Sequence, residues 1–161
     1  MSYRIHLAKE NFKFAATHFT VFGPNQSEHL HGHNYYVAVD LLVDEIDPQL
    51  GMAIDFNQLK PPIRDLCAQL DEKVLVPTQS KFLKVTHSGT QVNLEFGKKL
   101  YSFPKEDVVL LDIVNLTSEN LAHYFATRLA QGLKKKLKFK KISVTVQESR
   151  GQSITFSLKP N

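Results

Sequence analysis

Residues 30–41 read LHGHNYYVAVDL, and this stretch decides the fold and the position of the site. Side chains alternate between the two faces of a β-strand, so the period-two pattern here predicts a strand over about residues 32–43. His31 and His33 lie two residues apart and therefore on one side of that strand. The same side continues with an apolar row: Tyr35, Val37, Val39 and Leu41.

The segment 3–18 predicts a second strand, whose inward face changes halfway along. Ile5 and Leu7 occupy odd positions, but the later apolar residues occupy even ones, so we expect a bulge or break near residues 8–11. His18 ends the even-numbered apolar row of this segment, just as His31 and His33 end the apolar row that begins at Tyr35. If the two strands pair antiparallel, all three imidazoles converge at one end of the sheet.

Three converging imidazoles predict a metal site. Neutral imidazoles with no thiolate nearby suit zinc, and three protein ligands leave a fourth position open, as in catalytic zinc sites. The sequence thus assigns zinc to His18, His31 and His33, against the simpler alternative of unrelated core or surface histidines. His29 has the same parity in a turn region and is a possible fourth ligand.

The remaining elements indicate an α+β domain. Apolar residues at spacings of three and four predict helices over about residues 55–70 and from Thr117 or Ser118 to residue 133, with Asp55 as a cap and an irregular first turn before Pro61-Pro62. Further strands are expected at 82–86, 91–96, 108–113, 141–148 and 153–158. This order predicts one domain, 1–161, with an antiparallel sheet and two helices on one face. The other, more polar face is either solvated or used in assembly.

Composition excludes several classes. The 161 residues fit a single domain, and no apolar run reaches the length of a membrane span. Cys67 is the single cysteine, so no disulfide forms within the chain and a reducing, cytoplasmic location is expected. The net charge is only +4. The lysine run 134–141 is explained by its place at a predicted helix C-terminus, where positive charge is favourable, and no aromatic platform for base stacking accompanies it. Nucleic acid is therefore not an expected partner.

One acidic residue ends an apolar row. Ile142, Val144, Val146 and Glu148 alternate onto one face of a predicted strand. A carboxylate there is costly unless a ligand or a protein donor satisfies it, so Glu148 is a candidate binding residue. The alternative is a carboxylate that turns to solvent at the strand end.

Six stretches together resemble the 6-pyruvoyl-tetrahydropterin synthase / 6-carboxy-tetrahydropterin synthase family: FAATH (14–18), LHGHNYYVAVDL (30–41), GMAIDFNQLK (51–60), LDEKVL (70–75), NLTSENLA (115–122) and VTVQES (144–149). The resemblance implies the tunnelling fold, in which two trimers form a homohexamer with active sites between subunits. It implies zinc on the three histidines and Glu148 as the anchor of the pterin ring. Thr117 and Ser118 would be the hydroxyl pair beside the pterin.

The chain departs from that family at two places. No cysteine precedes the H-G-H motif, and the Asp-His pair typical of the family is Asp71-Glu72. The segment E-x-L-H-G-H-N-Y instead resembles a branch in which glutamate replaces the cysteine. That branch cleaves the side chain of 7,8-dihydroneopterin triphosphate to give 6-hydroxymethyl-7,8-dihydropterin, a folate precursor.

The resemblance to this branch implies Glu28 as the general base, and we expect partial burial to raise its pKa. Asp71 completes the catalytic set, with Glu72 either replacing the histidine as a proton carrier or lying at the surface. Two alternatives stay open. One is 6-pyruvoyl- or 6-carboxy-tetrahydropterin synthesis on the biopterin or queuosine route, and the other is a pterin- or zinc-binding protein without catalysis.

Overall fold

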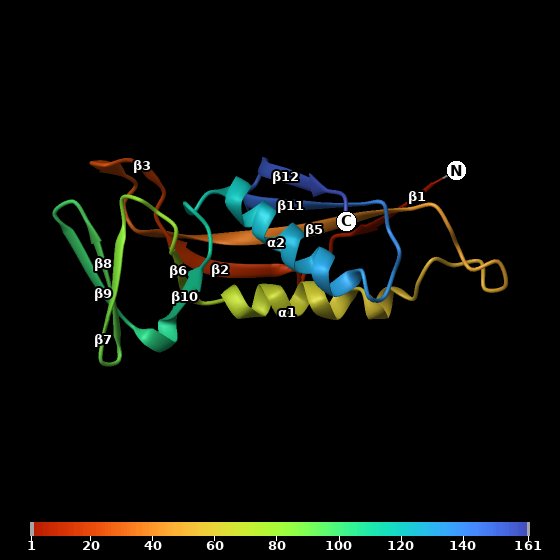
Figure 1. The fold of residues 1–161 in the computed structure, drawn as a ribbon, viewed down its shortest axis with the longest axis horizontal. Helices are drawn as coiled ribbons and strands as arrows, with labels where there is room; N and C mark the ends of the chain where they lie inside the picture. The colour runs from red at the N-terminus through yellow and green to blue at the C-terminus, as the bar shows by residue number, and fades with distance from the viewer. Residues whose placement is uncertain (1, 161) are drawn as a thin grey trace.

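The computed structural model describes residues 2–160. A seven-stranded sheet forms its centre, in the order β10-β6-β2-β5-β11-β12, with β1 also paired to β5. Two helices lie along this sheet, and a small three-stranded sheet stands at one end (Figure 1). The strands of the main sheet are β1 (Tyr3–Leu7), β2 (Lys13–His18), β5 (His31–Val43), β6 (Lys73–Pro77), β10 (Val108–Leu111), β11 (Lys141–Ser149) and β12 (Gln152–Leu158).

The long strand β5 organises the main sheet. Both β1 and β2 pair antiparallel with it, one after the other, and β11 pairs antiparallel with its other edge. The expected break lies between β1 and β2, where the Phe12 carbonyl accepts a hydrogen bond from the Val37 amide at 2.8 Å. Ile5 and Leu7 are buried before the break. After it the buried residues are the even-numbered ones from Phe12 to His18, so the predicted change of face is confirmed.

The sheet is mostly antiparallel, as predicted, but one end of it is not. β6 pairs parallel with both β2 and β10. β6 was not expected, because its apolar run Val74–Val76 is short and ends at Pro77. The pairing of two segments so far apart in the chain leaves no local pattern in the sequence.

The two helices pack on one face of the sheet. α1 (Lys60–Leu70) follows the 3₁₀ turn η1 (Phe56–Gln58), which Asp55 caps by accepting a hydrogen bond from the Asn57 amide at 2.9 Å. α2 (Ser118–Leu133) begins after Thr117, its N-cap. The inward sides of both helices and of the sheet form one apolar core, in which Phe14 stacks on Tyr35 at 4.8 Å and on Phe125 at 5.7 Å between ring centroids.

The small sheet and a short hairpin complete the fold. β7 (Lys84–Ser88), β8 (Gln91–Phe96) and β9 (Lys99–Pro104) form the three-stranded sheet, η2 (Lys105–Asp107) leads from it to β10, and β3 (Val21–Gly23) pairs with β4 (Gln26–Ser27). A second apolar cluster joins the small sheet to the β3 region. β9 was not expected as a separate strand, because its outward positions include Leu100 and its inward row begins with a lysine.

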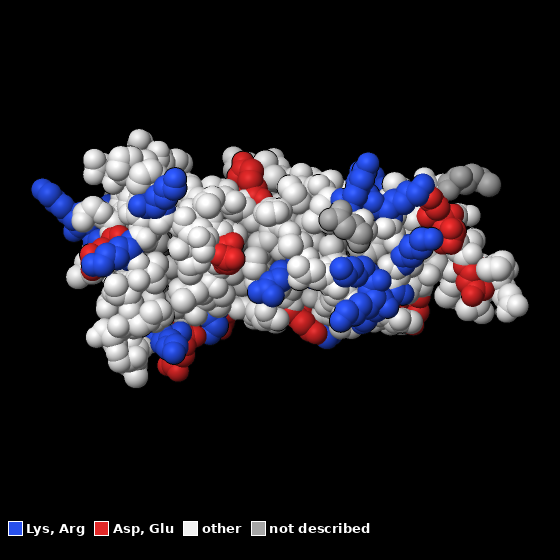
Figure 2. Space-filling model, viewed as in Figure 1, with Lys and Arg blue, Asp and Glu red and all other residues white. Residues whose placement is uncertain are grey.

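In the described part of the chain, neither helix covers the outer face of the main sheet. Hydroxyl groups on β11 and β12 pair across it, with 2.7 Å between Ser143 Oγ and Ser157 Oγ and between Thr145 Oγ1 and Thr155 Oγ1. Figure 2 shows basic side chains gathered near the end of α2, where the lysine run 134–141 follows the helix. Among residues 2–160, no helix is long and apolar enough to cross a membrane.

Candidate active site

The three predicted metal ligands do meet at one end of the main sheet. His18 pairs with His31 across β2 and β5, and Ala16 pairs with His33, so all three imidazoles lie on the inward face. The ring centroids of His18 and His31 are 4.8 Å apart, and one ligand nitrogen from each of the three residues lies within 4.8 Å of the others. This convergence follows from strand alternation and antiparallel pairing, as predicted.

A backbone carbonyl orients one of these imidazoles. His31 Nδ1 lies 2.8 Å from the His29 carbonyl, and since a carbonyl can only accept, Nδ1 carries the proton. In the neutral ring His31 Nε2 is then the acceptor, and it points into the cluster at 2.8 Å from His33 Nε2. Metal-binding histidines are typically oriented in this way by a carbonyl on the far nitrogen. His29 contributes its carbonyl rather than its ring, and its side chain is exposed.

His18 is the most deeply placed of the three. Its side chain is 1% exposed, and burial, together with the neighbouring His31, lowers its pKa despite the nearby Glu148. The neutral imidazole, which is the form that binds metal ions, is therefore favoured. His18 Nδ1 is buried and has no hydrogen-bond partner among the described residues. The donor set, its protonation and this unpartnered nitrogen all fit a metal ion held by the three histidines.

Glu148 lies next to the histidines, at the end of β11. Its Oε1 is 3.4 Å from His18 Nε2 and 3.6 Å from His33 Nε2. Tyr35 donates a hydrogen bond to the same oxygen at 3.0 Å, and Ser118 Oγ donates to Oε2 at 3.4 Å. Glu148 thus ends the inward row as predicted and remains 27% exposed. It borders a pocket of about 350 Å³ that Thr20, Thr117, Ser118 and residues 151–154 also line.

The predicted hydroxyl pair has two different tasks. Ser118 contacts Glu148, whereas Thr117 Oγ1 accepts a hydrogen bond from the Asn120 amide at 3.3 Å and caps α2. Tyr35 was not predicted as a site residue, because its position in an apolar row suggested a core role. Burial and the nearby Glu148 raise the pKa of its phenol, so Tyr35 stays protonated and acts as a donor.

Glu28 is held by a second residue that the sequence did not indicate. The Thr20 amide donates to Glu28 Oε2 at 2.8 Å, and the Glu28 amide donates to the Thr20 carbonyl at 3.0 Å. Burial raises the pKa of Glu28, but the hydrogen bonds from Thr20 and the nearby His31 and His18 outweigh it and lower that pKa overall. The expectation that partial burial would raise the pKa of Glu28 was therefore wrong, because its carboxylate is hydrogen-bonded.

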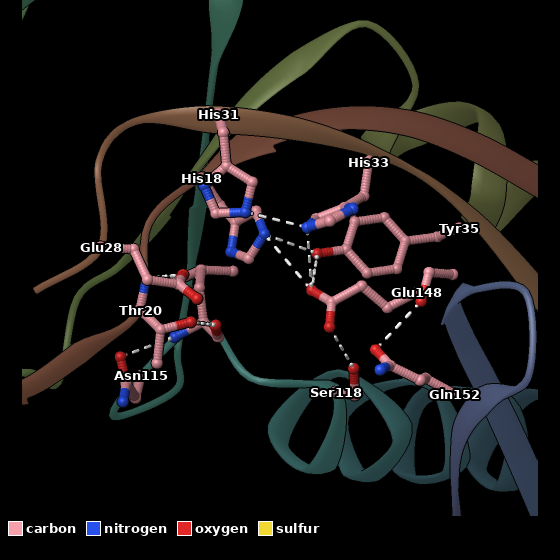
Figure 3. A network of polar contacts seen from close by, with 12 residues as sticks. His18, Thr20, Glu28, His31, His33, Tyr35, Asn115, Ser118, Glu148 and Gln152 are labelled. Atoms are coloured by element: carbon pink, nitrogen blue, oxygen red, sulfur yellow. Dashed lines mark hydrogen bonds and ion pairs between the residues drawn. The ribbon is translucent and has the colours of Figure 1, made fainter.

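Asn115 links the Glu28 loop to the start of α2. Its Oδ1 accepts from the Val21 amide at 3.0 Å and its Nδ2 donates to the Val21 carbonyl at 2.8 Å. Thr20 Oγ1 donates to the Leu116 carbonyl at 2.9 Å. Figure 3 shows the result, with Glu28 and Thr20 on one side of the imidazoles and Glu148 with Ser118 on the other.

Asp71 and Glu72 lie elsewhere in the chain. Asp71 Oδ1 accepts a hydrogen bond from the Ala15 amide at 2.7 Å, and it lines a separate pocket of about 370 Å³ beside Asn34 and Tyr36 on the outer face. Glu72 has a φ of 57° and its amide donates to the Ala15 carbonyl at 2.7 Å. Both residues are exposed, and within one chain they do not join the histidine cluster. Their catalytic assignment stays a prediction.

A mixed sheet with two helices on one face and a histidine cluster beside a carboxylate defines a known class of enzyme. The family profile of 6-pyruvoyl tetrahydropterin synthase matches residues 6–159. The chain therefore belongs to the 6-pyruvoyl tetrahydropterin synthase family, whose members act on pterins.

Similar proteins carry two different names. A Methanocaldococcus jannaschii protein, provisionally named 6-carboxy-5,6,7,8-tetrahydropterin synthase, is 33% identical over 89% of this chain and 88% of its own length. The crystal structure of 6-pyruvoyl tetrahydropterin synthase from Plasmodium vivax has a TM-score of 0.90 and 30% identity, with 99% of each chain covered. A second structure of the Plasmodium vivax enzyme, a mutant in which a catalytic glutamate is replaced by alanine, has the same TM-score at 29% identity, again covering 99% of each chain.

Proposed function

We propose that this chain is a zinc-dependent enzyme that cleaves the side chain of 7,8-dihydroneopterin triphosphate to 6-hydroxymethyl-7,8-dihydropterin. The observation that carries this proposal is the order of groups in the site. A carboxylate suited to a pterin ring, three imidazoles and a second carboxylate follow one another across the end of the sheet (Figure 3). A substrate anchored by its ring would place its side chain over the histidines and beside Glu28.

The ring end of the site is built for recognition. Glu148 accepts hydrogen bonds from Tyr35 and Ser118 but retains lone pairs toward the pocket, since each carboxylate oxygen can accept two. A pterin presents a ring N–H and an amino group side by side, which match the two oxygens of one carboxylate. Such charge-assisted bonds are about twice as strong as neutral ones, and they fix the orientation of the ring.

The side-chain end supplies the base. His18, His31 and His33 would hold zinc, which when bound makes a substrate hydroxyl more acidic and stabilises the oxyanion that remains. Glu28 would accept the hydroxyl proton, and as the adjacent carbon–carbon bond breaks, that oxygen becomes the carbonyl of an aldehyde that leaves with the triphosphate. The bonding electron pair moves into the C=N system of the pterin ring, and return of the proton to the carbon that stays on the ring gives the hydroxymethyl group. A glutamate is ionised at neutral pH and can accept a proton, but the lowered pKa of Glu28 makes it a weaker base than a free carboxylate. Thr20 holds the carboxylate in place for this step.

The similar proteins support both this reaction and its main alternative. The Plasmodium vivax mutant shows that a related 6-pyruvoyl tetrahydropterin synthase uses a glutamate as a catalytic residue, which favours Glu28 as the base here. The archaeal relative carries the name of the 6-carboxy activity. Conversion to 6-carboxy-tetrahydropterin is therefore the second candidate function.

Product analysis distinguishes these reactions. Purified protein with measured zinc content is incubated with 7,8-dihydroneopterin triphosphate, and the pterins are identified by mass spectrometry. We expect 6-hydroxymethyl-7,8-dihydropterin, whereas a carboxy or pyruvoyl pterin would contradict the proposed cleavage. No product at all would support a binding protein without catalysis.

Replacing Glu28 tests the base. Glu28→Gln keeps the size of the side chain but removes the proton acceptor, so product formation should fall about 100- to 10,000-fold with zinc content and pterin affinity nearly unchanged. Glu45→Gln, an exposed change at the other end of the sheet, is the matched control. Wild-type turnover in Glu28→Gln would show that another group is the base.

We also propose that the chain assembles as a homohexamer of two trimers. The bare, polar outer face and the exposed edge of β12 are available for sheet-to-sheet pairing, which would also cover open strand edges. Asp71 and Glu72 could then reach the site of a neighbouring subunit. Light scattering at micromolar concentration should give a hexamer, and a monomer would contradict the assembly and the shared site.

A further inference from the structure

Lys99 occupies an unusual position in the small sheet. Along β9, Lys99, Tyr101 and Phe103 are partly buried, whereas the residues between them are exposed. Lys99 pairs with the buried Phe96 across β8 and β9, and its Nζ lies 6.0 Å from the centre of the Phe96 ring. A lysine thus begins the inward, aromatic row of this sheet, although lysines are among the residues least often buried.

The ammonium group of Lys99 reaches the loop that carries Glu28. Its Nζ donates to Ser27 Oγ at 3.0 Å and lies 3.5 Å from the Glu28 carbonyl oxygen. Ser27 Oγ in turn donates to that carbonyl at 3.0 Å. Leu30 and Tyr101 both pack against the second apolar cluster, so the small sheet is held against this loop.

No carboxylate of the described residues pairs with this ammonium group. The ion pairs formed within residues 2–160 include Lys84 of the same sheet, which pairs with Glu95 at 3.0 Å, but they do not include Lys99. A lysine has three N–H donors, and its two oxygen neighbours leave one of them without a protein acceptor. Partial burial of an unpaired cation costs free energy, and an anionic ligand would recover it.

We propose that Lys99 binds the phosphate end of the substrate. The ring-binding Glu148 and the catalytic Glu28 lie on opposite sides of the imidazoles, and Lys99 lies on the Glu28 side, next to the Glu28 backbone. A ligand anchored at Glu148 and extended past the histidines therefore carries its far end toward Lys99. The inference rests on the proposed function, and it assigns the small sheet a role in selecting phosphorylated over unphosphorylated pterins.

Two substrates separate phosphate binding from a purely structural role. Lys99→Met keeps the length of the apolar stem but removes the charge. With 7,8-dihydroneopterin triphosphate, kcat/KM should fall about 10- to 150-fold, the range for loss of a hydrogen bond to a charged group. With 7,8-dihydroneopterin, which lacks phosphate, the same variant should lose much less, so the preference for the triphosphate over the unphosphorylated pterin should fall about tenfold or more. Lys99→Arg should retain most of the preference for the triphosphate.

Lys84→Met is the matched control. It removes the same charge from the same sheet, but at an ammonium group already paired with Glu95, so neither substrate should be affected. Equal losses with both substrates in Lys99→Met would show that Lys99 positions the Glu28 loop instead. No loss with either substrate would show that it binds nothing, and both outcomes overturn the proposal.

A binding measurement makes the test independent of the reaction. Inorganic tripolyphosphate is titrated into the protein by calorimetry, with zinc content measured before and after to detect extraction of the metal. The Kd should rise about tenfold or more in Lys99→Met and stay unchanged in Lys84→Met. Equal Kd values would overturn the assignment of Lys99 even if product analysis confirmed the proposed cleavage. A different pterin product with an intact Lys99 effect would overturn only the reaction.

Discussion

The two faces of the main sheet both carry a histidine beside a carboxylate, but the two sites are built differently. On the outer face, His6 Nδ1 lies 3.0 Å from Asp40 Oδ1, and Arg4 donates to the same oxygen. On the inner face, His18 Nε2 lies 3.4 Å from Glu148 Oε1. The outer histidine is 54% exposed and the inner one 1% exposed.

The difference lies in what balances each carboxylate. Asp40 has a permanently charged arginine beside it, so its negative charge is compensated within the chain. Glu148 has two neutral donors, Tyr35 and Ser118, and two neighbouring imidazoles, of which that of His18 has a pKa lowered by burial. The outer cluster is therefore complete, whereas the inner one leaves hydrogen-bonding capacity and charge for a metal ion and a substrate.

Removing one histidine from each face should give the largest contrast. His31→Ala should abolish both bound zinc and turnover, because two imidazoles do not hold a catalytic zinc ion firmly. His6→Ala should leave about one zinc per chain and wild-type activity, since His6 lies on the other face. Metal analysis and product formation measure both effects. Full zinc occupancy in a His18→Ala, His31→Ala double variant would show that the ligands were misassigned.

Neutralising each carboxylate should give a smaller contrast. Glu148→Gln removes a charged acceptor and should weaken pterin binding about 10- to 150-fold, equivalent to roughly 1.5–3 kcal/mol. Asp40→Asn should not change pterin affinity. Fluorescence titration with a non-reactive pterin measures both dissociation constants. Equal affinities in the two variants would show that Glu148 does not contact the ring, and the comparison of the two faces would fail.

The smallest effect concerns the stability contributed by the outer face. Burial raises the pKa of Asp40, but hydrogen bonds from Arg4 and His6 outweigh it and hold that pKa below its usual range. A carboxyl group with a lowered pKa in the folded state stabilises the protein above its unfolded-state pKa of about 4, and this contribution disappears as the pH falls through the lower folded-state value.

Urea unfolding at fixed protein concentration tests this linkage. At pH 7, Asp40→Asn should lose about 1 kcal/mol or less, as is usual for ion pairs near the surface. The difference between variant and wild type should shrink as the pH falls below about 4. A difference that stays constant between pH 7 and pH 3 would show that the ionised carboxylate is not the source of the stabilisation.

Strand alternation explains how much of the site the sequence could predict. His31, His33 and Glu148 end inward rows whose apolar members are all buried, and His18 does so once the break before Phe12 is recognised. The period of two is a local property of an extended chain, so it can be seen without knowing which strands pair. The two helices were predicted for the same reason, since their buried stripes repeat within one segment.

Contacts between distant segments could not be predicted in this way. Thr20 contacts Leu116, and Lys99 contacts Ser27, across gaps of 96 and 72 residues. These contacts depend on where the small sheet and the start of α2 come to lie after folding. One expectation failed because of a nearer contact: hydrogen bonds from Thr20, which precedes Glu28 by eight residues, lower the Glu28 pKa that burial alone would raise.

The sequence by itself determined the class of fold, the row ends that carry the three histidines and the acidic end of β11, because short-range periodicity fixes the face on which each side chain lies. The tertiary structure decided which of those side chains have hydrogen-bond partners within the chain and which keep capacity for a ligand. Tyr35 shows the division most clearly: its place in the inward row can be read from the chain, but its hydroxyl contact with Glu148 exists only because β5 and β11 pair in one register. Hydrogen bonds depend on distances in space, which local sequence patterns do not contain.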